Sequence, residues 1–409
     1  YKRQRKNRVT AESTQIDVKT AKAALFPSLS FSTSQQVVNR PYQETSSRVS
    51  GSEIISSNSK TSYNGNYGLN ASWTIYNGSK RLKTLKQERL NNQVAELDVA
   101  TSENMIKESI AQIYIQILYA AESVRVNENT LQVSIAQRDR GQELLNAGSI
   151  AKSDFAQLEA QVSTDRYQLV TAQATLQDYK LQLKQLLELD GENEMNVYLP
   201  KLSDENVLAP LPAKKDVYVS ALAIRPEIEA SKLNVEASEL GIDIAKSSYF
   251  PTISLSAGIG TNHTSGSDFT FGEQVKNGWN NSIGLSVSVP IFNNRQTKSA
   301  VQKAKLQRET DMLSLLDEQK ALYKTIESLW LDANSAQQRY AAANEKLRST
   351  QISYDLISEQ FNLGMKNTVE LLTEKNNLLQ AQQEQLQAKY MAILNTQLLK
   401  FYQGDKLTL

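Results

Sequence analysis

The sequence predicts a mainly α-helical fold with a membrane β-barrel portion, built as two tandem repeats. A Phe-Pro step ends a helical stretch and opens a serine-alternating strand at Phe26-Pro27, and again at Phe250-Pro251. A second alternating stretch follows each time. Each repeat also contains a stretch of about 70 residues without proline, which predicts an unusually long helix. Each repeat should therefore combine long antiparallel helices with a two-stranded β-hairpin.

The first repeat is expected over residues 1–189, with its hairpin at 27–76 and its long helices at 78–146 and 152–189. An irregular link follows at 190–213, where Pro200, Pro210 and Pro212 break regular structure. The second repeat is expected over residues 214–409. Its hairpin is predicted at 251–292 and its long helices at 293–361 and 366–403.

The predicted strands alternate with period two, so each has an apolar face and a serine-rich face. Ile253, Leu255 and Ala257 point to one side, whereas Ser254 and Ser256 point to the other. Such a strand either covers a core or lines a pore. Four strands cannot close a barrel, and an open edge in lipid leaves N–H and C=O groups unpaired at several kcal/mol each. One chain must therefore borrow strands from other copies, unless the sheet belongs to a water-soluble β-sandwich.

Aromatic residues gather at one end of the predicted strands, where an interfacial girdle of a membrane barrel would lie. These girdle candidates are Phe26, Tyr76, Tyr249, Phe250 and Phe292.

The helix predicted at 152–189 carries two apolar seams side by side. The first contains a single charge, Asp165, among Phe155, Leu158, Val162, Leu169, Ala172, Leu176, Tyr179, Leu183 and Leu186. The second consists of Ala156, Ala160, Ser163, Tyr167, Val170, Ala174 and Leu181. Two offset seams indicate a neighbour on each side, as in a closed ring of helices, although a core helix of a bundle would show the same pattern.

Composition narrows the functional classes. No stretch of the 409 residues is long and apolar enough to predict a transmembrane helix. The near balance of 45 basic and 44 acidic residues argues against nucleic acid as a main partner. The absence of cysteine and the single histidine, His263, argue against disulfides, thiol chemistry and most transition-metal sites. The start at Tyr1 lacks a secretory signal, so we expect a processed or trimmed chain.

The order of these motifs resembles the TolC-like outer-membrane factors, the outer membrane efflux proteins of Gram-negative bacteria. The resemblance spans almost the whole chain. It depends on the two Phe-Pro steps, on Arg225-Pro226-Glu227 at the start of the second repeat, and on Ala147-Gly148 and Leu363-Gly364 at the helix tips.

The resemblance implies a homotrimer in the outer membrane. Each subunit would give four strands to a 12-stranded β-barrel and long helices to a periplasmic α-helical barrel, with the 190–213 link in an equatorial belt. It also implies docking, tip to tip, on a periplasmic adaptor (membrane fusion) protein joined to an inner-membrane transporter. The docking candidates are the tip residues Ala147, Gly148, Ser149, Leu363, Gly364 and Met365.

The resemblance further implies a gated aperture near these tips. Asp154 and Glu370 each follow a tip glycine by six positions, where the family places acidic residues. Lys366 matches a basic residue of the family's entrance network, and Phe361 stands where the best-known member has a tyrosine. The alternative for both acids is a first-turn carboxylate that complements the helix dipole. For Lys366 the alternative is a solvated charge.

The predicted function is a passive outer-membrane exit duct of a tripartite efflux pump or a type I secretion system. The alternative is a non-transport coiled-coil structural or tethering protein of the cell envelope. An enzyme is not expected, because the sequence has no Gly-rich phosphate loop, no metal-ligand cluster and no plausible catalytic histidine. No cofactor is expected either.

Overall fold

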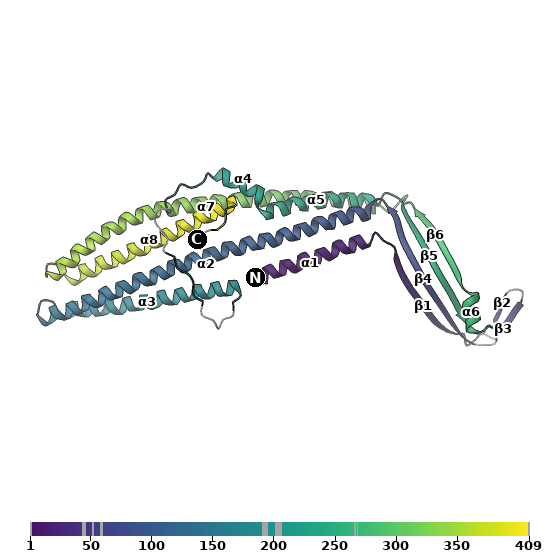
Figure 1. Ribbon diagram of the computed structural model, residues 1–409, viewed down its shortest axis with the longest axis horizontal. Helices are drawn as coiled ribbons and strands as arrows, with labels where there is room; N and C mark the ends of the chain where they lie inside the picture. Colours follow the sequence, from purple (N-terminus) through teal and green to yellow (C-terminus); the bar gives the residue numbers. More distant parts are fainter. Residues whose placement is uncertain are drawn as a thin grey trace. The chain divides into compact units, whose positions relative to one another are not determined.

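The computed structural model describes residues 2–42, 46–50, 53–57, 60–189, 195–200, 207–265, 267 and 269–407. It forms two compact units, each of which takes segments from both repeats (Figure 1). One unit comprises Tyr1–Val9, Glu96–Ser231 and Ser314–Leu409, and the other comprises Thr10–Ala95 and Lys232–Leu313. The compact units therefore do not coincide with the sequence repeats.

The helices dominate the chain, and their bounds lie close to those expected. The two longest are α2, Lys80–Asn146, and α7, Gln296–Asn362, each of 67 residues. The helices that return from their tips are α3, Lys152–Leu187, and α8, Thr368–Gln403. The shorter helices are α1 (Lys2–Ala23), α4 (Lys214–Ile224), α5 (Pro226–Ser247) and α6 (Phe271–Asn277). Among the described residues no helix combines the length and the apolar composition needed to cross a membrane.

The link predicted at 190–213 is described only at 195–200 and 207–213, and those parts contain no helix or strand. The rest of this prediction lies outside the described residues.

A four-stranded antiparallel sheet joins the two repeats in the order β1-β4-β5-β6. Its strands are β1 (Ser28–Asn39), β4 (Thr61–Asn77), β5 (Thr252–Thr264) and β6 (Asn280–Ser288). The register pairs Leu69 with Ile259 and Leu255 with Leu285, so apolar residues of neighbouring strands share one face. This face is open, and on β6 the Ile283 residue is 79% exposed.

Both connections between paired strands contain regular structure of their own. The first contains the small antiparallel pair β2 (Ser46–Ser50) and β3 (Glu53–Ser57). The second contains α6, whose N-cap residue is Thr270.

Each repeat turns from strand into long helix through two consecutive left-handed residues. Gly78 and Ser79 have φ of 66° and 63°, and at the corresponding point of the second repeat Asn294 and Arg295 have φ of 50° and 65°. A Cβ on Gly78 would lie 2.6 Å from the Ser247 carbonyl oxygen, so this position also requires glycine for space. The helices α2 and α7 therefore begin two and three residues after the starts predicted at 78 and 293.

The core of the first unit lies where α2, α4, α5, α7 and α8 meet. One cluster of buried residues is formed by Val217, Ala221, Ile228, Leu322, Ile326, Ala333, Leu399 and Tyr402. A second, formed by Ala111, Ile115, Leu118, Tyr390, Leu394 and Leu398, packs α2 against α8. Burial of this apolar surface holds the long helices side by side.

Candidate functional site

The two helix tips have the same geometry. After α2, the Gly148 N–H donates to the Leu145 carbonyl at 3.0 Å and the Ser149 N–H to the Leu144 carbonyl at 2.8 Å. After α7, the Gly364 N–H donates to Phe361 at 2.9 Å and the Met365 N–H to Gln360 at 2.9 Å. Both glycines are left-handed, with φ of 74° and 73°. These are Schellman ends, which explains why each tip needs glycine.

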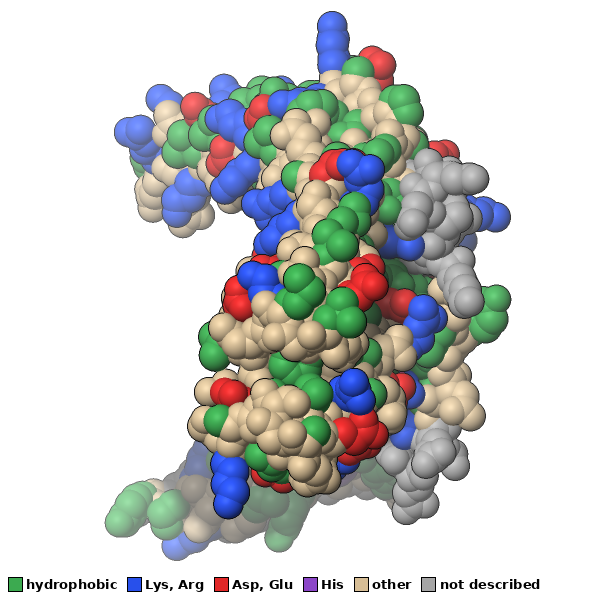
Figure 2. Space-filling view, turned by 90° about the vertical axis from the view of Figure 1, so that its left-hand side faces the viewer, with side chains coloured by type: hydrophobic (Ala, Val, Ile, Leu, Met, Phe, Trp, Pro, Cys, Tyr) green, Lys and Arg blue, Asp and Glu red, His purple; other side chains and the backbone are tan. Residues whose placement is uncertain are grey.

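The tips present apolar side chains to solvent, since Leu363 and Met365 are 69% and 70% exposed. Seen from this end of the molecule, hydrophobic side chains are interspersed with acidic and basic ones (Figure 2). Docking of Ala147, Gly148, Ser149, Leu363, Gly364 and Met365 on an adaptor stays a prediction.

Asp154 and Glu370 both occupy the third position of a helix and accept hydrogen bonds from the cap of that helix. The Ala151 N–H donates to Asp154 Oδ2 at 3.3 Å at the start of α3. At the start of α8, the Asn367 N–H donates to Glu370 Oε2 at 3.2 Å, and Lys366 Nζ donates to Glu370 Oε1 at 2.5 Å. Lys366 and the Asn367 N–H lower the pKa of the Glu370 carboxyl. The structure thus shows both acids as first-turn carboxylates.

Each of the four aperture candidates lies close to a tip, but the contacts described for the two acids stay within their own helix starts. Phe361 is buried at the end of α7 and has no hydroxyl with which to bond a carboxylate. A role for Asp154, Glu370, Lys366 and Phe361 in an aperture therefore stays a prediction.

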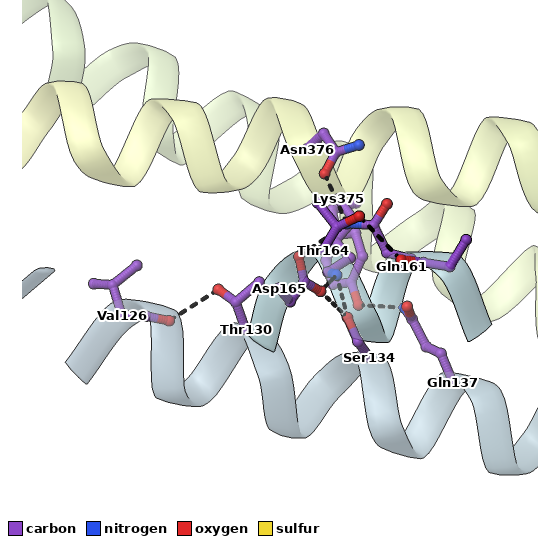
Figure 3. Close-up of polar contacts among 11 residues, drawn as sticks. Val126, Thr130, Ser134, Gln137, Gln161, Thr164, Asp165, Lys375 and Asn376 are labelled. Atoms are coloured by element: carbon purple, nitrogen blue, oxygen red, sulfur yellow. Dashed lines mark hydrogen bonds and ion pairs between the residues drawn. The ribbon is translucent and has the colours of Figure 1, made fainter. Parts of the chain in front are cut away.

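A buried polar layer, consisting of Ser134, Asp165 and Lys375, connects three of the long helices (Figure 3). These residues come from α2, α3 and α8 and are 2%, 1% and 3% exposed. Lys375 Nζ donates to Asp165 Oδ2 and to Ser134 Oγ, and Ser134 Oγ donates to the same carboxylate oxygen. The layer therefore joins the α2/α3 hairpin to the α7/α8 hairpin.

Further polar contacts surround the buried polar layer. Gln161 Nε2 donates to the second Asp165 oxygen at 2.9 Å and approaches Asn376 Oδ1 at 3.4 Å. Burial lowers the pKa of the Lys375 ammonium, and the Asp165 carboxylate opposes this effect. A charge in such surroundings needs its partner.

The sequence contained one signal for this layer. Asp165 is the only charge in an otherwise apolar seam of α3, and an isolated charge on a buried face requires a counter-ion. Lys375 gave no signal of its own, because it lies in the polar stretch Glu374-Lys375-Asn376-Asn377.

A second buried charge lies at the Arg-Pro-Glu motif. The Arg225 guanidinium bonds to Glu227 Oε1 at 2.7 Å and to Glu108 Oε1 at 3.2 Å, and its Cζ lies 4.1 Å from the centre of the Tyr402 ring. Burial, reinforced by the Glu108 charge, raises the pKa of Tyr402 to about 12. This motif therefore connects the start of α5 to α2 and α8.

The girdle candidates follow the strand ends. Phe26 and Phe250 lie two residues before β1 and β5. Tyr76 is the last but one residue of β4, and Phe292 lies four residues after the end of β6. Because the register pairs Thr252 with both Asn77 and Ser288, these positions share one end of the sheet. All five girdle candidates are exposed. Their contact with lipid stays a prediction.

Comparison with known proteins identifies relatives of one kind. The chain is 25% identical to the outer membrane efflux protein BepC of Brucella suis over 294 residues, covering 71% of this chain and 61% of that protein. It is 24% identical to the outer membrane protein TolC of Escherichia coli over 341 residues, covering 80% of this chain and 66% of TolC. The chain thus spans slightly less than two thirds of the length of these two relatives.

Solved structures show the same fold. A crystal structure of CusC superimposes with a TM-score of 0.83 at 19% identity, covering 98% of this chain and 89% of CusC. The outer membrane protein VceC of Vibrio cholerae superimposes with a TM-score of 0.80 at 16% identity, covering 98% and 92%. The predicted fold class, mostly helical with a few strands in two tandem repeats, is confirmed.

A profile of the family described as outer membrane efflux protein matches residues 5–188 and, separately, residues 217–404. Each match falls within one predicted repeat, and together they cover far more than half of the chain. The chain is therefore a protein of the Gram-negative outer membrane and belongs to the outer membrane efflux protein family.

Proposed function

We propose that three copies of this chain form a passive exit duct of a tripartite efflux pump or a type I secretion system, and that the chain itself catalyses no reaction. The observation that carries this proposal is the four-stranded sheet. Within the described residues β1 pairs only with β4 and β6 only with β5, so each outer edge lacks a partner. A sheet that is apolar on an exposed face and open at both edges is unstable alone in lipid.

Joining β1 of one copy to β6 of the next would pair both open edges of the four-stranded sheet. Three copies would supply twelve strands, enough for a barrel with a water-filled interior. The apolar face with Leu69, Ile259 and Leu285 would then contact lipid. The opposite face, with Ser254, Ser256 and Ser286, would contact water.

The helical unit also offers surfaces for a second copy. The second seam of α3 is exposed along its whole length, and Tyr167 is 74% exposed. A groove between α7 and α8 has small residues in its lining, among them Ser335, Ala336, Ala343 and Ala388, together with the charged side chains of Asp332, Arg339, Lys346 and Glu384. Large side chains of one surface could fill the spaces beside small residues of the other, as in knobs-into-holes packing. We propose that α3 of one copy lies in this groove of the next, which would close a ring of helices.

The tips would dock on a periplasmic adaptor that is joined to an inner-membrane transporter. Leu363 and Met365 supply exposed apolar contacts for such a partner. Relatives carry names that refer to toxin and drug export and to protease secretion. The proposal therefore covers both an efflux pump and a secretion system.

The duct is tested by planar-bilayer conductance of the purified oligomer, with two neighbouring positions of β6 as matched variants. The Leu285→Lys variant places a charge on the lipid face, where the cost is about 2–4 kcal/mol per copy at the bilayer midplane and falls toward the interfaces, so it should strongly reduce insertion and conductance. The Ser286→Lys variant should insert normally and shift the channel toward anions, because its charge faces the water-filled interior.

Two results would contradict this proposal. One is a monodisperse monomer that is stable in detergent-free buffer. The other is equal insertion of the Leu285→Lys and Ser286→Lys variants, since the two faces of β6 would then be equivalent.

Docking is tested by a photo-crosslinker placed at Met365 in cells that express a candidate adaptor. We expect a crosslinked adaptor band from Met365, and none from a matched position 14 residues before the end of α7, Arg348, which is also exposed. Equal crosslinking from both positions would mean that the tips are not the docking surface.

A further inference from the structure

The end of the sheet opposite the girdle candidates carries its own aromatic residues, which the sequence analysis did not single out. Phe269, Phe271 and Trp279 lie in and beside α6 and are 47%, 57% and 56% exposed. Exposed aromatic residues at this density need a partner that accepts both their apolar rings and the nearby polar groups.

The helix α6 is held firmly on the sheet. The Thr264 N–H donates to Gln274 Oε1 at 2.8 Å, and Thr261 Oγ1 donates to the Val275 carbonyl at 2.7 Å. The start of α6 is closed by a capping box, in which the Thr270 N–H donates to Glu273 Oε2 at 2.8 Å. The position of α6 on β5 is therefore a defined part of the fold.

The contacts also show which face of the sheet α6 covers. Thr261 and His263 belong to the same alternating set as Leu255, Ala257 and Ile259, so their side chains lie on the apolar face. The ring of His263 contacts Phe271, with 5.1 Å between ring centres, and stacks on Tyr67 at 6.0 Å. The helix α6 therefore packs on the apolar face and not on the serine face.

The apolar face of the sheet ends at the row of residues that α6 covers. Thr33, Tyr67 and Thr261 lie in one row of the register, and Asn281 pairs with Ile259 just before it. The stretch of β5 from Ile253 to Thr261 advances about 27 Å, or about 21 Å along the membrane normal at a tilt of about 40°. That height is comparable with the roughly 25 Å apolar band of an outer-membrane barrel. The helix α6 is therefore at the boundary of the band.

We infer that α6 and its flanking aromatic residues are a lipid-binding shelf, which lies at the boundary between acyl chains and headgroups in the outer leaflet. This inference depends on the proposed membrane barrel. It commits to lipid because the shelf, Phe269, Phe271 and Trp279, continues the face that the barrel turns to lipid. In addition, the indole of Trp279 is amphipathic and matches the preference of tryptophan for membrane interfaces.

The test uses the protein's own tryptophans, of which there are three. One full-length variant, with Trp73→Phe and Trp330→Phe, keeps only Trp279. A sister variant keeps only Trp73, which lies on the apolar face near the other end of the sheet, opposite Leu255. Each trimer is reconstituted into phosphatidylcholine vesicles whose lipids carry bromine either near the headgroup or near the end of the acyl chain.

We expect Trp279 fluorescence to be quenched by brominated lipid, with a larger loss when the bromine lies near the headgroup. Quenching of Trp279 by aqueous acrylamide alone, or by neither reagent, would overturn the inference, because α6 would then lie in water or under protein. The variant that keeps only Trp73 separates the lipid-binding shelf from the proposed duct. Quenching of Trp73 without quenching of Trp279 would remove the shelf and leave the duct, whereas no quenching of either would remove both.

If a variant with two substitutions does not assemble, the same information comes from a single substitution. The difference in quenching between the unaltered chain and Trp279→Phe reports Trp279 alone. A difference that is zero with brominated lipid would also overturn the inference.

Discussion

Replacing Lys375 by methionine is expected to lower the free energy of unfolding by about 3–5 kcal/mol. Methionine fills a similar volume but leaves the Asp165 carboxylate, which is 1% exposed, without its cation. Ser134 and Gln161 would still donate to Asp165, but neither carries a charge that could replace the ammonium. The measurement is urea unfolding of the detergent-solubilised protein followed by helical circular dichroism.

Two further variants test the physical reason for that loss. The double variant Asp165→Leu with Lys375→Met removes both charges and should recover most or all of the stability, because an apolar replacement of a buried pair is often neutral or stabilising. Lys320→Met removes a surface cation that pairs with Asp317 at 3.7 Å, where the two side chains are 78% and 79% exposed, so it should cost less than about 1 kcal/mol. Equal stability of the Lys375→Met variant and the unaltered chain would show that Asp165 is not held by this pair.

Replacing Arg225 by methionine should also cost about 3–5 kcal/mol. Arg225 is 7% exposed and bonds to two carboxylates, so its loss leaves Glu108 and Glu227 facing each other in a partly buried site. Burial already raises the pKa of Glu108, and Arg225 opposes that rise. Removing the arginine should therefore raise the pKa of Glu108 further, and part of the loss should be relieved at acid pH.

Two variants serve as controls for Arg225→Met: Arg225→Lys keeps the charge, and Arg308→Met removes an arginine of a surface ion pair. Lysine keeps the charge but cannot bond two carboxylates with a planar group or stack on Tyr402, so we expect an intermediate loss. Arg308 bonds to Glu239 at 2.7 Å with side chains that are 38% and 51% exposed, and its loss should be small. If Arg308→Met destabilised as much as Arg225→Met, burial would not be the source of the effect. Urea unfolding at neutral and acid pH measures both sites.

The long helices and the sheet could be predicted from the sequence, because their signals are local. Proline is absent over each long helix, and the strands alternate strictly, so a shift of one residue would reverse both faces. The helix α6 was missed although a local signal exists. Thr270-Phe271-Gly272-Glu273 has the spacing of a capping box, but it lies in a connection whose polar composition suggested only a loop.

The candidate site was less predictable, because it depends on contacts between distant residues. Asp154 and Glu370 could be located from the tip glycines, but whether a carboxylate faces its own helix cap or a neighbouring helix is a tertiary property. Asp165 and Lys375 are separated by 210 residues, and no local pattern pairs them. A charge inside an apolar seam indicates that a partner exists, but it does not identify the partner.

The ion pair of the buried polar layer limits how the two hairpins can move against each other. A slide of α8 along α3 by one helical turn, about 5.4 Å, would carry the Lys375 ammonium away from Asp165 and toward Val162 or Leu169. Both charges would then face hydrocarbon. Translation along the helix axes is therefore opposed at this level, whereas a swing of the tips about the layer would keep the pair intact.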